Sequence, residues 1–183
     1  MTGFVAAAII IIKQNMVDIS INDDVSSLIK SEKFNNPVKI KNENIPEINI
    51  NKTEIKNITS GRLYNEIKNR FPEYKITYYK NIKNSELIEK IYDSLSDNMP
   101  AICAFAVDNE VDYCVVTEMD IPEDKITIKT PSGYTETYTI QDFLCAARFE
   151  NYENMEFYLK LRFAVGLFTK NTVYILEKPG ESE

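Results

Sequence analysis

The feature that most constrains the fold is a pair of apolar segments joined by a very short polar connection. The two segments are Ala101 to Val107 and Val111 to Met119, and the three residues between them are Asp, Asn and Glu. Two apolar runs on either side of such a connection are typical of an antiparallel β-hairpin. The hairpin therefore predicts that an antiparallel sheet begins after Pro100.

The chain beyond the hairpin continues the sheet. We predict strands at 124–129, 134–138 and 172–176, and a short helix at 140–147 that Thr139 caps. Residues 155–168 fit two structures. Their apolar side chains alternate as in a strand, whereas their length and the polar pair Lys170-Asn171 that follows favour a helix. We predict a helix for this segment.

The first half of the chain is predicted to be mainly helical. Apolar residues recur at helical spacing in 60–71 and in 85–95, and Asn84 is placed to cap the second of these helices. With helices at 3–15 and 21–31, a loop at 34–56 and a strand at 74–79, these elements predict an α+β fold. A chain of 183 residues fits a single domain, with a helical half at about 1–98 and a sheet half at about 99–183.

The N-terminal region contains nine consecutive apolar residues, Phe4 to Ile12. A signal peptide or a membrane span is the alternative to a buried segment of the fold. No positive charge precedes the run, and it is far shorter than the roughly 20 residues that a membrane helix needs. We therefore expect a helix that is buried in the domain, and no membrane span.

The composition excludes several kinds of chemistry. The chain has no histidine, so His-based triads and His–metal sites are ruled out. Its three cysteines form no CxxC pair, and we expect neither a metal site nor a cofactor. A net charge of -7 disfavours binding to nucleic acid. Few cysteines and no secretion signal predict reduced, buried thiols and a cytoplasmic protein.

Two stretches of the sheet half resemble a known family. They are the strand from Asp112 to Asp120, which begins Asp-Tyr-Cys-Val-Val, and the strand and turn Ile126 to Gly133, which end Thr-Pro-Ser-Gly. They resemble the strands His-Tyr-x-Val-Val-x-Gly-x-Asp and Asp/Asn-Pro-x-Gly of papain-like cysteine peptidases, in the bacterial double-glycine leader peptidase-like group. The resemblance implies a papain-like fold, in which a buried central helix of the N-terminal helical half packs on a C-terminal antiparallel sheet.

The same resemblance shows that the catalytic positions are replaced. The positions that match the family's cysteine, histidine and Asp/Asn are Gly3 or Phe4, Asp112 and Thr130, and none can do the usual chemistry. The resemblance therefore implies a catalytically inactive pseudo-peptidase that binds a peptide or protein partner. Its candidate groove residues are Gly3, Phe4, Asp112, Glu118 and Thr130. Period-two alternation predicts that Asp112, Cys114, Val116 and Glu118 share one face of their strand.

Two other functions stay open at this point. One is an enzyme that uses non-standard residues in the same groove, such as Asp112 with Cys114, or a metal held by the acidic residues that crowd the ends of the hairpin. The other is a structural or assembly subunit whose apolar segment Phe157 to Phe168 packs on a partner chain. Cys103 and Cys114 are placed to be near-opposite across the hairpin, and we expect two free thiols there rather than a disulfide. The sequence leaves the oligomeric state open.

Overall fold

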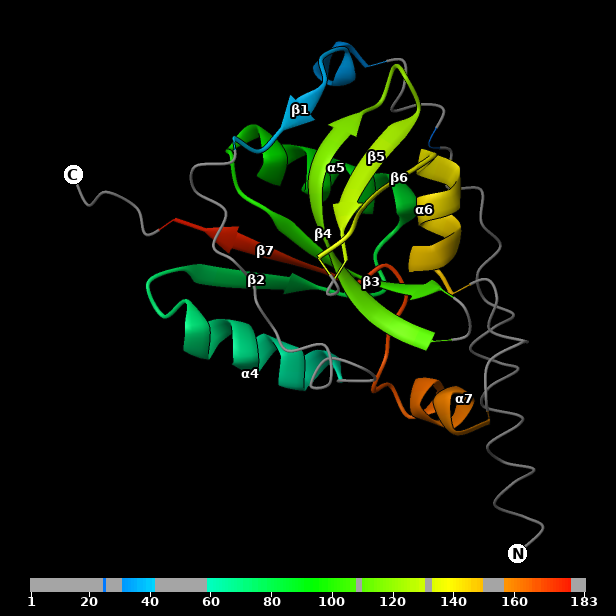
Figure 1. Ribbon diagram of the computed structural model, residues 1–183. Coiled ribbons are helices and arrows are strands. Elements are labelled where there is room, and N and C mark those ends of the chain that lie inside the picture. The colour runs from blue at the N-terminus through cyan, green and yellow to red at the C-terminus, as the bar shows by residue number, and fades with distance from the viewer. Residues whose placement is uncertain are drawn as a thin grey trace, which may run out of the picture.

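The computed structural model describes residues 25, 31–41, 59–107, 110–130, 133–149 and 157–178. These residues form an α+β fold around one antiparallel sheet of seven strands (Figure 1). Six strands follow the order β2-β7-β3-β4-β5-β6, and β1 pairs with β4 beside this path. The strands are β1 (Val38–Lys39), β2 (Lys75–Tyr79), β3 (Ala101–Val107), β4 (Glu110–Asp120), β5 (Lys125–Lys129), β6 (Thr135–Tyr138) and β7 (Val173–Glu177).

The predicted hairpin is confirmed as β3 and β4, and its register sets Cys103 directly opposite Cys114. With eleven residues β4 is longer than β3, which has seven, so one end of β4 extends past its partner. Strand β1 pairs there, with Val38 opposite Met119. Because an unpaired strand edge invites association with other chains, this short strand protects the long strand of the hairpin.

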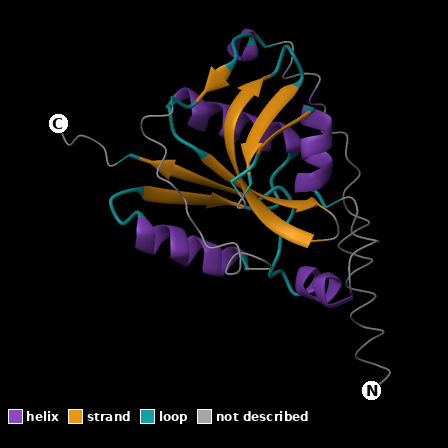
Figure 2. Cartoon of the chain, in the orientation of Figure 1, coloured by secondary structure: helices purple, strands orange, loops and turns teal. Residues whose placement is uncertain are grey.

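Helices cover both faces of the sheet (Figure 2). On β3, Cys103 and Phe105 point to a core under α5 and α6, whereas Ile102 and Ala104 point to a core under α4 and α7. The boundary near residue 98 does not separate helices from strands, since β2 precedes it and two helices follow it. The helices are η1 (Glu32–Phe34, a 3-10 turn), α4 (Ser60–Arg70), α5 (Asn84–Ser96), α6 (Ile140–Ala147) and α7 (Phe157–Ala164).

Helix α5 carries one apolar stripe, and the domain buries all of it. The stripe consists of Leu87, Ile88, Ile91 and Leu95, each at most 2% exposed. The expected cap is wrong, because Lys83 is the N-cap residue and Asn84 is already helical. The side chain of Asn84 instead accepts a hydrogen bond of 2.8 Å from Nδ2 of Asn171, which ties the start of α5 to the loop before β7.

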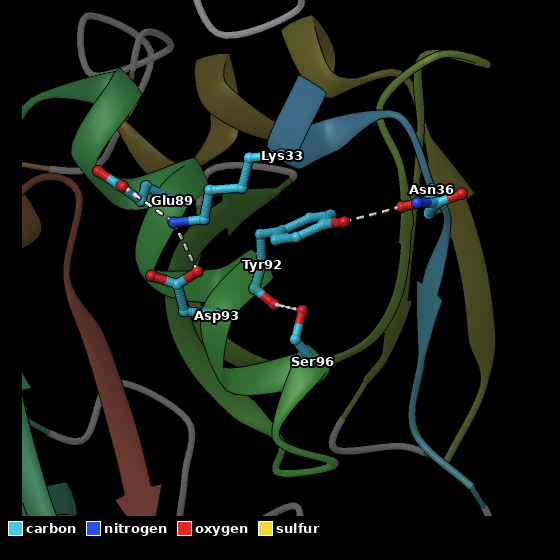
Figure 3. A network of polar contacts seen from close by, with 6 residues as sticks. All are labelled: Lys33, Asn36, Glu89, Tyr92, Asp93 and Ser96. Atoms are coloured by element: carbon cyan, nitrogen blue, oxygen red, sulfur yellow. Dashed lines mark hydrogen bonds and ion pairs between the residues drawn. The ribbon is translucent and has the colours of Figure 1, made fainter. Parts of the chain in front are cut away.

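The segment before β1 is fastened to the outer side of α5 (Figure 3). Nζ of Lys33 forms ion pairs with Glu89 at 3.0 Å and with Asp93 at 2.8 Å. The hydroxyl group of Tyr92 donates to the carbonyl oxygen of Asn36 at 3.0 Å. These contacts fix the position from which β1 reaches β4.

The predicted helices at 3–15 and 21–31 lie outside the described residues, except for Val25 and Ser31. Val25 is helical and packs against the core under α5 and α6. Ser31 is extended and precedes the 3-10 turn η1, so the predicted end of the second helix is wrong. Among the helices of the described ranges, none has the length and apolar character that crossing a membrane requires.

Candidate functional site

Asp112 and Thr130, which match two of the family's catalytic positions, lie at the same end of the sheet. Asp112 is opposite Phe105 and alternates with Cys114, so it is on the face that α5 and α6 cover. Thr130 directly follows β5, whose Lys129 pairs with Val115, so the register continues to place Thr130 beside Cys114. The positions that would complete the groove, Gly3 and Phe4, lie outside the described residues.

Asp112 and Thr130 both form hydrogen bonds with the local backbone. Oδ1 of the half-buried Asp112 accepts a hydrogen bond of 2.8 Å from the N–H of Tyr113. The N–H of Thr130 donates to the carbonyl of Tyr134 at 2.9 Å, and its hydroxyl group donates to the same oxygen at 3.3 Å. Gly133 closes this turn with a positive φ of 84°, which suits a glycine. Thr130 therefore acts as a turn residue.

Glu118 does not belong with these two residues, and the predicted shared face is wrong. The β4–β5 register shifts between Val116, which pairs with Ile128, and Glu118, which pairs with Thr127. The extra residue, Thr117, makes a β-bulge, which reverses the alternation of side chains beyond it. Glu118 consequently lies on the opposite face from Asp112, where its carboxylate forms an ion pair of 2.7 Å with Lys39.

The paired thiols of the hairpin are unsuited to nucleophilic chemistry. Cys103 and Cys114 are free and completely buried. Burial raises the pKa of Cys103, and burial together with the neighbouring Cys103 and the Asp112 carboxylate raises the pKa of Cys114 well above its usual value. The thiolate is the reactive form of cysteine, so both groups stay protonated and inert. The suggested pairing of Asp112 with Cys114 thus works against catalysis, since a carboxylate disfavours a thiolate.

The acids near the hairpin stabilise turns where the structure describes them. Oδ1 of Asp120 accepts from the N–H of Glu123 at 3.1 Å, and Oδ1 of Asp124 accepts from the N–H of Ile140 at the start of α6, also at 3.1 Å. Within the described ranges, no group of three or more Asp, Glu or Cys side chains is arranged to hold a metal ion. These carboxylates are used by the fold itself.

A group of tyrosines that the sequence did not mark as a cluster lies under α4. The rings of Tyr78 and Tyr174 stack at 4.8 Å, and Tyr113 contacts Tyr174 edge-on at 6.3 Å. The hydroxyl group of Tyr174 donates to the carbonyl of Ser60 at 2.8 Å. Burial raises the pKa of Tyr113 to about 12, so its phenol stays neutral at ordinary pH. The cluster anchors α4 to the sheet and offers no ionised group for chemistry.

The described surface shows one concentration of exposed apolar side chains, on α7 and the turn that follows it. Five of the six large apolar side chains that are exposed in the described residues lie here: Phe157 (66%), Tyr158 (44%), Leu161 (42%), Val165 (64%) and Leu167 (40%). Phe157, Leu161 and Val165 are four residues apart, so they form one stripe along the helix. We call this stripe the outer face of α7.

The opposite side of α7 holds the helix on the domain. Leu159 is buried, and the ring of Phe163 meets that of Phe149 edge-on at 4.5 Å. The helix ends at Ala164, and in the turn that follows Gly166 has a φ of 73° and its N–H donates to the carbonyl oxygen of Phe163 at 2.9 Å. The N–H of Leu167 donates to the backbone carbonyl oxygen of Arg162 at 2.9 Å, which completes a Schellman motif. The outer face is therefore carried by a well-anchored helix.

The helix predicted for 155–168 is confirmed over Phe157–Ala164. The sequence did not show which apolar residues of this helix would be exposed. The one available signal was their alternation at every second position, which on a helix places apolar side chains on two sides. The candidate site is accordingly the exposed apolar surface on α7. Of the candidate groove residues, Asp112 and Thr130 lie at one end of the sheet, and Glu118 lies on its opposite face. The chain matches no protein-family model and no curated protein.

Proposed function

We propose that this chain is a non-catalytic binding module, built on a papain-like scaffold, that holds a protein or peptide partner. The observation that carries the proposal is the outer face of α7 with its flanking residues, where five large apolar side chains are exposed within residues 157–167. Soluble domains rarely expose contiguous apolar surface of this kind, and such patches mark interaction sites.

The proposal of an inactive scaffold is supported by the chemistry of the remaining side chains. The chain has no histidine to hold a thiolate, and Cys103 and Cys114 are buried with raised pKa values. The link to papain-like peptidases rests on the sequence resemblance of 112–120 and 126–133, and on the position of Asp112 and Thr130 at one end of the sheet. A scaffold that has lost catalysis is free to keep a binding role.

The side chains on α7 suit an apolar helix or strand of a partner. Phe157 and Tyr158 supply aromatic rings, the residue types that most often anchor protein interfaces. Completing the burial of one such side chain stabilises a complex by up to about 1.5–3 kcal/mol. Three or four of them therefore supply enough affinity for a specific complex, once the costs of association are offset.

The test uses one charged substitution on the outer face and one away from it. The full chain, Leu161→Asp and the control Thr135→Asp are used to isolate partners from cells, and the affinity of each is then measured with the purified partner. We expect Leu161→Asp to weaken binding at least about tenfold, since it places a charge in an apolar contact, and Thr135→Asp to leave binding unchanged. A partner that binds both variants equally would remove α7 from the proposal.

The alternative of an enzyme with non-standard residues is tested by thiol labelling at neutral pH. Cys145 is half-exposed, and Nε2 of Gln141 donates to its sulfur at 3.4 Å. We expect a maleimide to modify Cys145 first and to leave Cys103 and Cys114 unmodified in the folded protein. Rapid, selective modification of Cys114 would instead show an activated nucleophile and would contradict the non-catalytic proposal.

A structural or assembly subunit is the second candidate, because the exposed surface of residues 157–167 would equally fit a neighbouring subunit. Sedimentation velocity of the full chain over a wide range of concentrations separates the two. An assembly subunit would form a complex of fixed size that Leu161→Asp dissociates. A clean monomer at high concentration would count against a homo-oligomer and in favour of a different partner.

A further inference from the structure

We infer that the partner of the outer face of α7 is an amphipathic helix of another protein, whose apolar row is flanked by Asp or Glu side chains. The inference rests on the proposed function, because it names the class of partner that the same surface binds. Two observations carry it: the shape of the exposed apolar surface, and the sign of the charges beside it.

The exposed apolar surface is one row on a helix. Phe157, Leu161 and Val165 are 66%, 42% and 64% exposed, and the N–H of Val165 still donates to the carbonyl oxygen of Leu161 at 3.1 Å, so helical spacing holds along the whole row. Side chains four residues apart form the ridges that pack into the grooves of a second helix. An extended peptide gains its main-chain hydrogen bonds from an open strand edge, which a helix surface does not offer. The row therefore fits a helix.

The charges beside the row are positive. A helix turns by about 100° per residue, so Lys160 and Arg162 lie on the two flanks of Leu161, and both are partly exposed. The segment from Phe157 to Lys170 contains no acidic residue, although the chain has a net charge of -7. The nearest acid in the sequence, Glu156, precedes the helix, at the end where the helix dipole favours a carboxylate.

These cations also have contacts within the domain. The guanidinium of Arg162 lies over the ring of Phe168, 5.9 Å from its centroid, and Lys160 takes part in an interaction of its own. Such contacts hold a side chain in position without removing its charge. The two charges attract an acidic partner over distances longer than a direct contact, which raises the rate of association and selects against basic partners.

A second copy of the chain is disfavoured by the same charges. In a two-fold interface centred on Leu161, the flanks of one helix would meet the equivalent flanks of the other. Lys160 and Arg162 would then face cations, and like charges that meet across an interface weaken the complex. A helix with acidic flanks replaces this repulsion by attraction.

A lipid surface fits less well than a protein helix. Anionic lipids would attract Lys160 and Arg162, but they would repel a chain whose net charge is -7. Helix α7 has only eight residues, whereas many helices that lie in a membrane interface have about 20–30. A protein helix with acidic flanks is the occupant that agrees with both the row and the charges.

The experiment selects partners for the full chain from a displayed library. The library presents helices of about 18 residues, long enough to be helical, with leucines at heptad spacing and random residues on the flanks. We expect the enriched helices to carry more Asp and Glu than Lys and Arg on their flanks. They should bind Leu161→Asp at least about tenfold more weakly than wild type. Enrichment of basic or uncharged flanks would overturn the inference.

Charge reversal then locates the contact. Lys160→Glu should weaken the binding of an enriched acidic helix about threefold to tenfold, and Lys160→Gln should weaken it less. The same helix with its acids replaced by lysines should prefer Lys160→Glu to wild type. Lys68→Glu, on the exposed side of α4, is the matched control and should leave both affinities unchanged. Raising the salt from about 50 mM to about 500 mM should reduce the differences.

Failure of the inference and failure of the proposed function give different results. Helices that require Leu161 but bind wild type and Lys160→Glu equally would overturn the acidic partner and leave the proposed function intact. A selection without any Leu161-dependent helix would overturn the inference, and the partner isolated from cells would then decide the proposed function by itself. Leu161-dependent binding to phosphatidylglycerol vesicles, or a Leu161-dependent dimer in sedimentation, would overturn the inference in favour of a lipid surface or a second copy.

Discussion

Helices α5 and α7 are both rich in apolar residues, but they expose them very differently. In α5 these residues form one stripe, and the sheet buries all of it. In α7 the apolar residues occur at every second position. Because a helix turns by about 100° per residue, this spacing places apolar side chains on two sides of the helix. Leu159 and Phe163 face the domain, whereas Phe157 and Leu161 point away from it. The comparison teaches that the domain can bury every apolar residue of a helix when they lie on one side. A helix with apolar residues on two sides keeps one of them exposed unless another surface covers it.

The largest difference is expected in the free energy of unfolding. Ile91 of α5 is completely buried, so Ile91→Ala should cost about 2–5 kcal/mol through lost burial and the cavity that remains. Leu161→Ala on the outer face of α7 should cost about 1 kcal/mol or less, because that side chain is 42% exposed. Urea denaturation of both variants measures the two values. Equal losses would break the comparison and show that both helices are buried alike.

The end of α7 offers a second test. Gly166 has a φ of 73°, a conformation that costs a residue with a side chain about 1–2 kcal/mol. Gly166→Ala should therefore destabilise the protein by about 1 kcal/mol and loosen the turn that carries Val165 and Leu167. The control is Gly61→Ala in α4, where an added Cβ meets no atom within 4 Å. Gly61→Ala should stabilise the protein by about 0.5–1 kcal/mol. Thermal unfolding of the two variants measures both changes. If both variants shifted the stability in the same direction, the left-handed conformation assigned to Gly166 would be wrong.

The smallest effect concerns the solvent side of α5, which carries charge where α7 carries apolar groups. Hydrogen bonds and ion pairs with Asp93 and Glu89 raise the pKa of Lys33 above its ordinary value of 10.5. A raised folded pKa means that this contribution is complete below pH 10.5 and is lost as the pH rises through the folded value. Because Lys33 is 41% exposed, solvent screening limits the effect to about 0.5 kcal/mol or less.

The measurement is the free energy of unfolding from about pH 9 to about pH 12. Wild type should lose slightly more stability over this range than Lys33→Gln, which lacks the ion pairs. Lys68→Gln, on the exposed side of α4, is the matched control and should follow wild type. Parallel curves for all three proteins would mean that the charged side of α5 contributes nothing, and that only its apolar side distinguishes it from α7.

Short-range patterns predicted the type and position of most described elements. Turn residues and apolar periodicity located β3 and α6 to the residue, and the side chain of the predicted cap Thr139 accepts the hydrogen bond expected of it. Of the candidate groove residues, Asp112 lies in β4 and Thr130 directly follows the neighbouring strand β5. Glu118 was assigned to the wrong face because an inserted residue, Thr117, reverses the alternation, and no local pattern marks such a bulge.

The sequence by itself determined most of the described helices and strands, and it excluded histidine chemistry, because these follow from residue type and local periodicity. Only the tertiary structure decided that β7 lies between β2 and β3, that the bulge at Thr117 turns Glu118 away from Asp112, and that one side of α7 remains exposed. These outcomes depend on contacts between residues far apart in the chain. Their free energies are summed over the whole domain, so no single segment contains the information.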